Sequence, residues 1–182
     1  MAIKLDAELI AVLTFLRTHP GVRERLPASR DKTVVYSGGI SRGAEVYRAW
    51  QLLAQAKAQD PARFDYVTLE ERLRQFHVVG FGETLFEYSN RVAQSLKSRG
   101  LDDQAAILWR ALSGIYVQGA RGKVRALILP DAKIGKSVFS LTEVNVLLRQ
   151  DVLQNIQLDP NLLRDFRLMV KVGSNPTPIV VF

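Results

Sequence analysis

The sequence predicts one α/β domain in which N-terminal helices pack with a small, partly parallel C-terminal sheet. Apolar residues recur at helical spacing through most of the first 118 residues, and strand-like segments gather after residue 119. Consecutive strand segments are separated by helical stretches, which is typical of parallel pairing. We expect a single domain over residues 1–182, with a helical part over about 1–118 and an α/β part over about 119–182.

A helix is predicted first, because Asp6 is a suitable N-cap and Pro20-Gly21 is a stop signal. Three leucines of this segment share one face: Leu9, Leu13 and Leu16. The β-branched segment 32–36 then predicts a strand, and the turn at residues 37–39 leads into a second helix. The apolar stripe of that helix contains Val46, Tyr47, Trp50, Leu53 and Ala54.

Pro61 ends the second helix, and a brief extended piece over residues 64–69 precedes the next one. Thr68 is the predicted N-cap of this next helix, with Glu70 and Glu71 in its first turn. After a glycine-containing loop over 76–82, we expect helices over about 83–98 and 102–119. Gly100 and an N-cap at Asp102 separate those two helices.

The C-terminal third contains most of the strand signals. Residues 122–129 alternate between apolar and other residues and predict a strand, and 141–150 predict a short helix. Residues 152–157 predict another strand. A hairpin of 166–172 with 177–182, turning around 174–178, is expected to supply an antiparallel edge to the sheet.

The composition excludes several classes of protein. No apolar stretch approaches the roughly 20 residues of a membrane-spanning helix, so we expect no membrane span. The absence of cysteine excludes disulfides and thiolate metal sites, and with only His19 and His77 we expect no metal. The net charge of +7 fits either a nucleic-acid binder or an enzyme acting on a phosphate-bearing anion.

Two segments in the first half place reactive or aromatic side chains where packing does not demand them. Tyr36 and Ser37 end a predicted strand, at the edge where open α/β sheets bind ligands. The alternative is an ordinary core aromatic. Glu70 and Glu71 point about 100° apart on a helix, so one of them can face a cleft. The alternative is favourable charge at a helix N-terminus.

Two further segments lie in the second half. Trp109 and Ser113 share a stripe at the edge of an apolar arc, where an indole could meet a flat ring and a hydroxyl a phosphate. The alternative is a partly buried tryptophan with a small neighbour. Glu143 lies among apolar residues shortly after Phe139. A carboxylate in such surroundings is expected to cap a helix, to be paired with another group or to have a functional role. The alternative is a capping box closed on Ser140.

These four segments, in this order, resemble the ADP-ribosyl cyclase/NAD glycohydrolase family and its bacterial toxin-domain branch. The shared motifs are aromatic-Ser-Gly after a strand (34–38), Thr-Leu-Glu-acidic (68–71), a tryptophan helix before a strand (109–124) and Phe-x-x-x-Glu-Val (139–144). The resemblance implies an ADP-ribosyl cyclase-like fold. It also implies a glycohydrolase that cleaves the nicotinamide–ribose bond of NAD or NADP, giving nicotinamide and ADP-ribose.

The resemblance also implies residue roles. Glu143 matches the catalytic glutamate, and Glu70 matches an acidic residue near the nicotinamide amide or the ribose. Tyr36 and Trp109 match two aromatics that stack on nicotinamide, although many relatives have tryptophan where Tyr36 stands. Ser113 matches a hydroxyl near the phosphates. Ser37 and Phe139 belong to the motifs and are counted with the substrate-binding residues.

The expected biological setting follows from the same resemblance. The disulfides of animal ectodomain members are absent, which favours a bacterial enzyme acting in a cytoplasm, or a secreted effector delivered into a target cell. Such a toxin implies a cognate immunity protein as partner. We expect NAD or NADP as substrate, no cofactor and no nucleic-acid partner. The alternatives are a basic ribonuclease-type toxin, with His77 and Glu70 as acid and base, and a non-catalytic nucleotide-binding relative.

Overall fold

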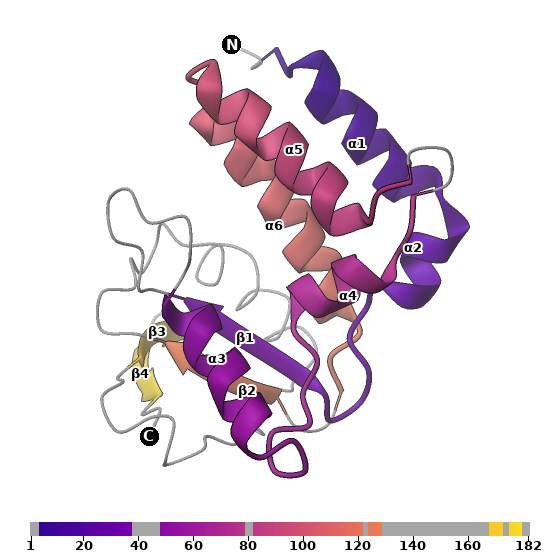
Figure 1. Cartoon of the computed structure of the whole chain (residues 1–182). Coiled ribbons are helices and arrows are strands. Elements are labelled where there is room, and N and C mark those ends of the chain that lie inside the picture. The colour runs from indigo at the N-terminus through magenta and orange to yellow at the C-terminus, as the bar shows by residue number, and fades with distance from the viewer. Residues whose placement is uncertain are drawn as a thin grey trace. The chain divides into compact units, whose positions relative to one another are not determined.

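The computed structural model describes residues 4–37, 48–78, 82–121, 124–128, 168–172 and 175–179. Over these ranges the chain forms six helices, a two-stranded parallel sheet and a two-stranded antiparallel sheet (Figure 1). The predicted mixed α/β class is therefore confirmed.

The chain divides into two compact units. The helical unit contains Met1–Ala28 and Thr68–Gly119, and the sheet unit contains Ser29–Val67 and Ala120–Phe182. One boundary between the units follows Gly119, close to residue 118, at which the sequence predicts a division between a helical and an α/β part. Residues 29–67, however, cluster with the C-terminal part of the chain, because their strand pairs with a strand that follows residue 120.

The helical unit begins with α1 (Ala7–Thr18) and α2 (Pro20–Arg25). The predicted N-cap is confirmed, since the Asp6 carboxylate accepts a hydrogen bond from the Glu8 N–H at 3.0 Å. Pro20 begins a helix as well as ending one, because proline suits the first helical position. His19 lies between the two helices, and its Nδ1 accepts a hydrogen bond from the Gly21 N–H at 3.2 Å.

Three more helices complete this unit: α4 (Leu69–Gln75), α5 (Leu85–Ser98) and α6 (Asp102–Gln118). Thr68 caps α4 as predicted. The N-cap expected at Asp102 is wrong, because Asp102 is the first residue of α6 and Leu101 holds the N-cap position without a side-chain hydrogen bond. Helices α5 and α6 pack together, and α1 contacts both of them (Figure 1). Their shared core includes Leu9, Leu85, Leu96, Leu108, Leu112 and Tyr116.

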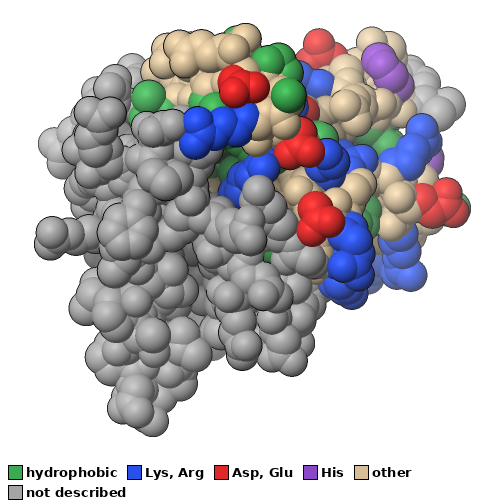
Figure 2. All heavy atoms as spheres, turned by 90° about the horizontal axis from the view of Figure 1, so that it is seen from below, with side chains coloured by type: hydrophobic (Ala, Val, Ile, Leu, Met, Phe, Trp, Pro, Cys, Tyr) green, Lys and Arg blue, Asp and Glu red, His purple; other side chains and the backbone are tan. Residues whose placement is uncertain are grey.

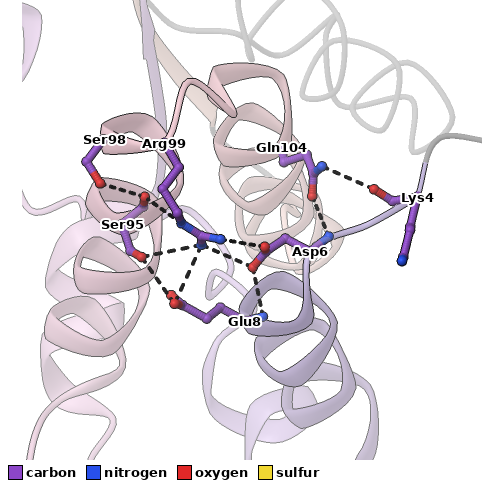
Figure 3. A network of polar contacts seen from close by, with 7 residues as sticks. All are labelled: Lys4, Asp6, Glu8, Ser95, Ser98, Arg99 and Gln104. Carbon is purple, nitrogen blue, oxygen red and sulfur yellow. Dashed lines mark hydrogen bonds and ion pairs between the residues drawn. The ribbon is translucent and has the colours of Figure 1, made fainter.

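A polar network fixes the start of α1 to the α5–α6 turn (Figure 3). The Arg99 guanidinium donates to both carboxylate oxygens of Asp6, at 2.6 and 3.1 Å, and to the Ser95 carbonyl at 3.2 Å. The Gln104 side chain accepts from the Asp6 N–H at 2.7 Å and donates to the Lys4 carbonyl at 3.3 Å. The hydrogen bond from Arg99 is the main cause that lowers the pKa of Asp6.

The C-terminal end of α6 contacts Ala28, the last residue of the Met1–Ala28 segment of the helical unit. The Ala28 N–H donates to the Tyr116 carbonyl at 2.8 Å. Gly119 caps α6, and a Cβ atom placed on it would lie 2.2 Å from the Ala28 carbonyl oxygen. This close approach of two backbone segments requires glycine, although the φ angle of −83° would suit any residue.

The sheet unit is built on β1 (Thr33–Ser37) and β2 (Val124–Ile128), which pair in parallel with Thr33 opposite Val124. Helix α3 (Arg48–Gln59) contacts both strands. Leu53 of this helix is buried as predicted, but Ala54 is exposed, and Ala56 is the buried alanine. Residues 46 and 47 of the predicted stripe lie outside the described residues.

The predicted C-terminal hairpin is confirmed as β3 (Leu168–Val172) with β4 (Asn175–Ile179). The second strand begins earlier than predicted. Pro176 and Pro178, which the sequence places in the turn, lie two residues apart within β4, where an edge strand tolerates a missing N–H. Over the described residues this pair forms a sheet of its own rather than an edge of the β1–β2 sheet. The helix predicted at 141–150 and the strand at 152–157 lie outside the described residues.

Candidate functional site

Tyr36 lies near the carboxyl end of β1, where the sequence places it. It pairs with Leu127 of β2 and is half-buried, while Val34 and Val35 of the same strand are buried. Part of the Tyr36 surface is therefore accessible near the carboxyl ends of a parallel pair of strands, which is where open α/β sheets bind ligands. Ser37 is the last residue of β1 and pairs with Ile128.

Glu70 lies in the first turn of α4, and its neighbour Glu71 performs the capping role. The Glu71 N–H donates to the Thr68 hydroxyl at 3.2 Å, and the Glu71 carboxylate accepts from the Thr68 N–H at 2.7 Å. Glu70 takes no part in this capping box. It is half-buried, and its Oε2 atom is inaccessible to solvent. Capping therefore accounts for Glu71, and Glu70 lies where the sequence predicted it, in the first turn of α4.

Trp109 and Ser113 both lie on α6, but their surroundings differ. Trp109 is half-buried, whereas Ser113 is only 1% exposed. Leu112 and Tyr116, on either side of Ser113 in the sequence, are completely buried. The predicted stripe therefore does not follow the edge of the apolar face along the whole of α6, because it is half-buried at Trp109 and fully buried from Ser113 onward. For Ser113 this position corresponds to the packing alternative, since its hydroxyl is not presented to solvent.

The described candidate residues are divided between the two units. Glu70, Trp109 and Ser113 belong to the helical unit, and Tyr36 and Ser37 belong to the sheet unit. Glu143 and Phe139, the remaining two candidates, lie outside the described residues. A common cleft for these side chains accordingly stays a prediction.

His77, the histidine of the ribonuclease alternative, is exposed just after α4. Its backbone forms an isolated antiparallel bridge with Thr84. His77 and Glu70 both belong to the helical unit.

An aromatic cluster in the helical unit was not predicted from the sequence. The His19 ring lies 4.9 Å from that of Phe15 and 5.4 Å from that of Phe76, between ring centroids. Tyr88 contacts Phe15 at 6.4 Å, and the Arg25 guanidinium lies 4.8 Å from the Phe76 ring. The spacing of Phe15 and His19, one helical turn apart, was a signal for part of this cluster.

A group of cations around the segment 64–66 of the sheet unit was not predicted either. Lys32 and Arg125 both form ion pairs with Asp65. The hydrogen bond from Lys32 is the largest cause that lowers the pKa of Asp65. These three residues are far apart in the sequence, so no local pattern could bring them together.

The described residues contain no group of three or more His, Cys, Asp or Glu side chains that could hold a metal ion. Among the helices of those same residues, none combines the length and apolar character needed to cross a membrane. Comparison of the chain with protein-family models, curated proteins and solved structures finds no match. The family resemblance therefore rests on the four sequence motifs.

Proposed function

We propose that this chain is an NAD(P) glycohydrolase with an ADP-ribosyl cyclase-like fold, which releases nicotinamide and ADP-ribose. The order of the four motifs is the observation that carries the proposal, and the half-buried position of Glu70 in the first turn of α4, outside the capping box, is compatible with a binding role.

The proposed chemistry is the breaking of one C–N bond with water as the second reactant. As the nicotinamide–ribose bond breaks, the electron pair stays with nicotinamide and positive charge develops on the ribose. A carboxylate near that charge stabilises the transition state more than the ground state. Water then adds to the ribose carbon and releases a proton, giving ADP-ribose. Glu143 is the proposed electrostatic partner of the ribosyl cation and forms no covalent bond to it.

Glu70, Tyr36 and Trp109 have binding roles in this proposal. The Glu70 carboxylate accepts hydrogen bonds from the nicotinamide amide or the ribose hydroxyls. Tyr36 and Trp109, each half-buried, are the proposed stacking partners of the cationic nicotinamide. Cation–π attraction of about 0.5–2 kcal/mol holds the nicotinamide ring while it is cationic and is lost when the ring becomes neutral, so these contacts contribute to substrate binding and ease release of the product rather than bond breaking. Ser113 has no substrate contact in this scheme because it is buried.

The proposal extends to the biological setting that the resemblance implies. The chain acts as a bacterial effector that depletes NAD in the cytoplasm of a target cell, and its producer carries an immunity protein. The absence of cysteine is compatible with activity in a reducing compartment.

Incubation with NAD, followed by chromatography of the products, tests the activity. We expect nicotinamide and ADP-ribose from the wild-type chain, no product from Glu143→Gln, and a strong loss with Glu70→Gln. Glu24→Gln is a matched control, because Glu24 is an exposed carboxylate of the same unit as Glu70. An unchanged rate in Glu143→Gln would refute the mechanism. Cleavage of RNA instead of NAD would favour the ribonuclease alternative, and calorimetric binding of NAD without turnover would favour a non-catalytic relative.

A further inference from the structure

His19 lies at the corner between α1 and α2 and contributes hydrogen bonds to both helices. Its N–H donates to the Phe15 carbonyl at 2.9 Å and so ends α1. Its Nδ1 atom accepts from the Gly21 N–H at 3.2 Å and so begins α2. Aspartate, asparagine, serine and threonine are the usual residues for this second role, because their side-chain oxygens remain acceptors at neutral and mildly acidic pH. Histidine differs from them, because its acceptor nitrogen is lost when the ring takes up a proton.

The hydrogen bond from Gly21 requires a neutral imidazole at His19. A neutral imidazole has one N–H and one acceptor nitrogen, so the tautomer that caps α2 carries its proton on Nε2. When the ring takes up a second proton, Nδ1 becomes a donor that faces another donor, the Gly21 N–H. The charged ring also places a positive charge at the N-terminus of α2, where the helix dipole is unfavourable to cations. Both effects weaken the cap.

A neighbouring cation, Arg25 of α2, adds to this effect. The Arg25 Nη2 atom and the His19 Nδ1 atom lie 3.0 and 3.2 Å from one point, the position that a Cβ atom on Gly21 would take. The Arg25 guanidinium is also 4.8 Å from the centre of the Phe76 ring, which holds it on this side of the corner. A proton on His19 therefore brings two positive charges close together.

The side of the corner formed by α5 contributes titratable groups of both charges. Tyr88 contacts the Phe15 ring, with 6.4 Å between ring centres. Arg91 lies over the Tyr88 ring and forms an ion pair with Glu83 at 2.6 Å, so these two charges largely offset each other. Burial raises the pKa of Tyr88, so its hydroxyl stays neutral in the range where histidines titrate.

The rings that enclose the imidazole do not replace the hydrogen bond. The ring centre of His19 is 4.9 Å from that of Phe15 and 5.4 Å from that of Phe76. A charged imidazole keeps these aromatic contacts and can be attracted by them. They supply no acceptor for the Gly21 N–H, however, so the cap of α2 is lost all the same.

The helix that depends on this cap is short and covers apolar residues. Because α2 has only six residues, its cap is a large share of its hydrogen bonds. Val22 within the helix and Leu26 at its end are both buried, and opening of α2 brings them into contact with water. The His19 ring itself is half-buried, so it can exchange protons with solvent. Figure 2 shows histidine side chains at the described surface, close to those of Lys and Arg.

We infer that the corner between α1 and α2 is a pH-sensitive switch, in which protonation of His19 loosens α2. Imidazole side chains change charge between roughly pH 5 and 8, so the switch operates in that range. The neutral ring stabilises the folded corner. This contribution is therefore present above the range and is lost as the pH falls through it. The switch is independent of NAD cleavage, because it uses none of the residues proposed for that reaction.

Amide hydrogen exchange of the full chain, followed residue by residue by NMR at about pH 7.5 and about pH 5, tests this inference. Protection factors are compared, so that the intrinsic effect of pH on exchange is removed. We expect the protection of the Gly21 and Val22 amides to fall about fivefold on acidification, which is the effect of losing one helix cap. Amides in the middle of α5 should keep their protection, because they lie away from the corner.

Three variants assign the effect to His19. His19→Asn keeps a good N-cap whose amide oxygen does not titrate, so this variant should fold and lose the pH dependence. His77→Asn is the matched control, because it replaces the other histidine of the chain at an exposed position after α4, and it should behave like the wild type. Arg25→Gln removes the neighbouring cation and should make the fall in protection smaller.

Three results would overturn the inference. The first is equal protection of the Gly21 amide at the two pH values in the wild-type chain. The second is a fall in His19→Asn as large as that in the wild type, or the disappearance of the fall in His77→Asn. The third is an equal fall across α1, α5 and α6, which would assign the effect to carboxylates of the helical unit rather than to His19.

Discussion

Replacing Gly119 with alanine should destabilise the chain although the backbone conformation at this residue suits alanine. Gly119 has a φ angle of −83°, so the substitution causes no backbone strain by itself. The new Cβ atom would lie 2.2 Å from the Ala28 carbonyl oxygen and 2.7 Å from the Ala28 nitrogen. Ordinary contacts of this kind exceed 3 Å, so one of the two backbone segments must move.

The magnitude follows from what that movement breaks. Overpacking costs about 1–3 kcal/mol, and loss of the hydrogen bond from Ala28 to Tyr116 adds about 1 kcal/mol. The lower entropy of unfolded alanine offsets about 0.4–1 kcal/mol. We therefore expect Gly119→Ala to lower the free energy of unfolding by about 1–3.5 kcal/mol, measured by urea denaturation followed by circular dichroism.

Gly100→Ala is the appropriate comparison, because at Gly100 an alanine would be strained by the backbone conformation but would meet no neighbouring atom. Gly100 has a φ angle of +72°, and no atom lies within 4 Å of the position that a Cβ would take, so its substitution introduces strain without a clash. It should cost about 1 kcal/mol. Ala28→Gly should not rescue Gly119→Ala, because the closest clashes are with backbone atoms. A loss below about 0.5 kcal/mol in Gly119→Ala, or full rescue by Ala28→Gly, would refute the reasoning from close approach.

Three further predictions concern the helical unit. The pKa of Asp6 is lowered chiefly by its hydrogen bond from Arg99, so the stability from this pair is present at neutral pH and is lost as pH falls through the lowered pKa. Arg99→Gln should flatten the fall in unfolding free energy below about pH 4 in urea titrations, and an unchanged acid limb would contradict this assignment. Ser89→Ala should leave stability unchanged or raise it by up to about 1 kcal/mol in thermal denaturation. The reason is that the Ser89 hydroxyl is fully buried without a hydrogen-bond partner among the described residues. A clear loss of stability would mean that the hydroxyl has a partner. Thr84→Ala should cost about 1 kcal/mol in urea denaturation, because it removes a capping box with Glu87, and a cost near zero would show that the cap contributes nothing.

Local signals in the sequence predicted the elements of the fold well. The caps at Asp6 and Thr68 are correct because each depends on residues within one turn of the helix. The strand at 32–36 and the later strand at 122–129 are also correct, since β-branched and alternating segments are short-range patterns. The parallel pairing expected from their separation is present as well.

Features that depend on distant neighbours could not be predicted in the same way. Periodicity gives a helix an apolar face but does not say where that face ends, so Ser113 is buried while Ala54 is exposed. The grouping of residues 29–67 with the C-terminal part depends on a strand pairing that no local pattern specifies. Of the candidate site, the sequence predicted the position of Tyr36 near the end of a strand and of Trp109 on a helix, and the common cleft stays a prediction.

The parallel pairing of β1 with β2 has a consequence for synthesis on the ribosome. Thr33 and Val124 are about 90 residues apart, and the second segment of the helical unit is translated between them. At a translation rate of roughly 5–20 residues per second, β2 is synthesised several seconds or more after β1. All residues of the helical unit have been made by Gly119, so this unit can fold first. Slowed translation before residue 124 should therefore leave a folded helical unit beside an exposed β-strand, the kind of edge that chaperones protect from aggregation.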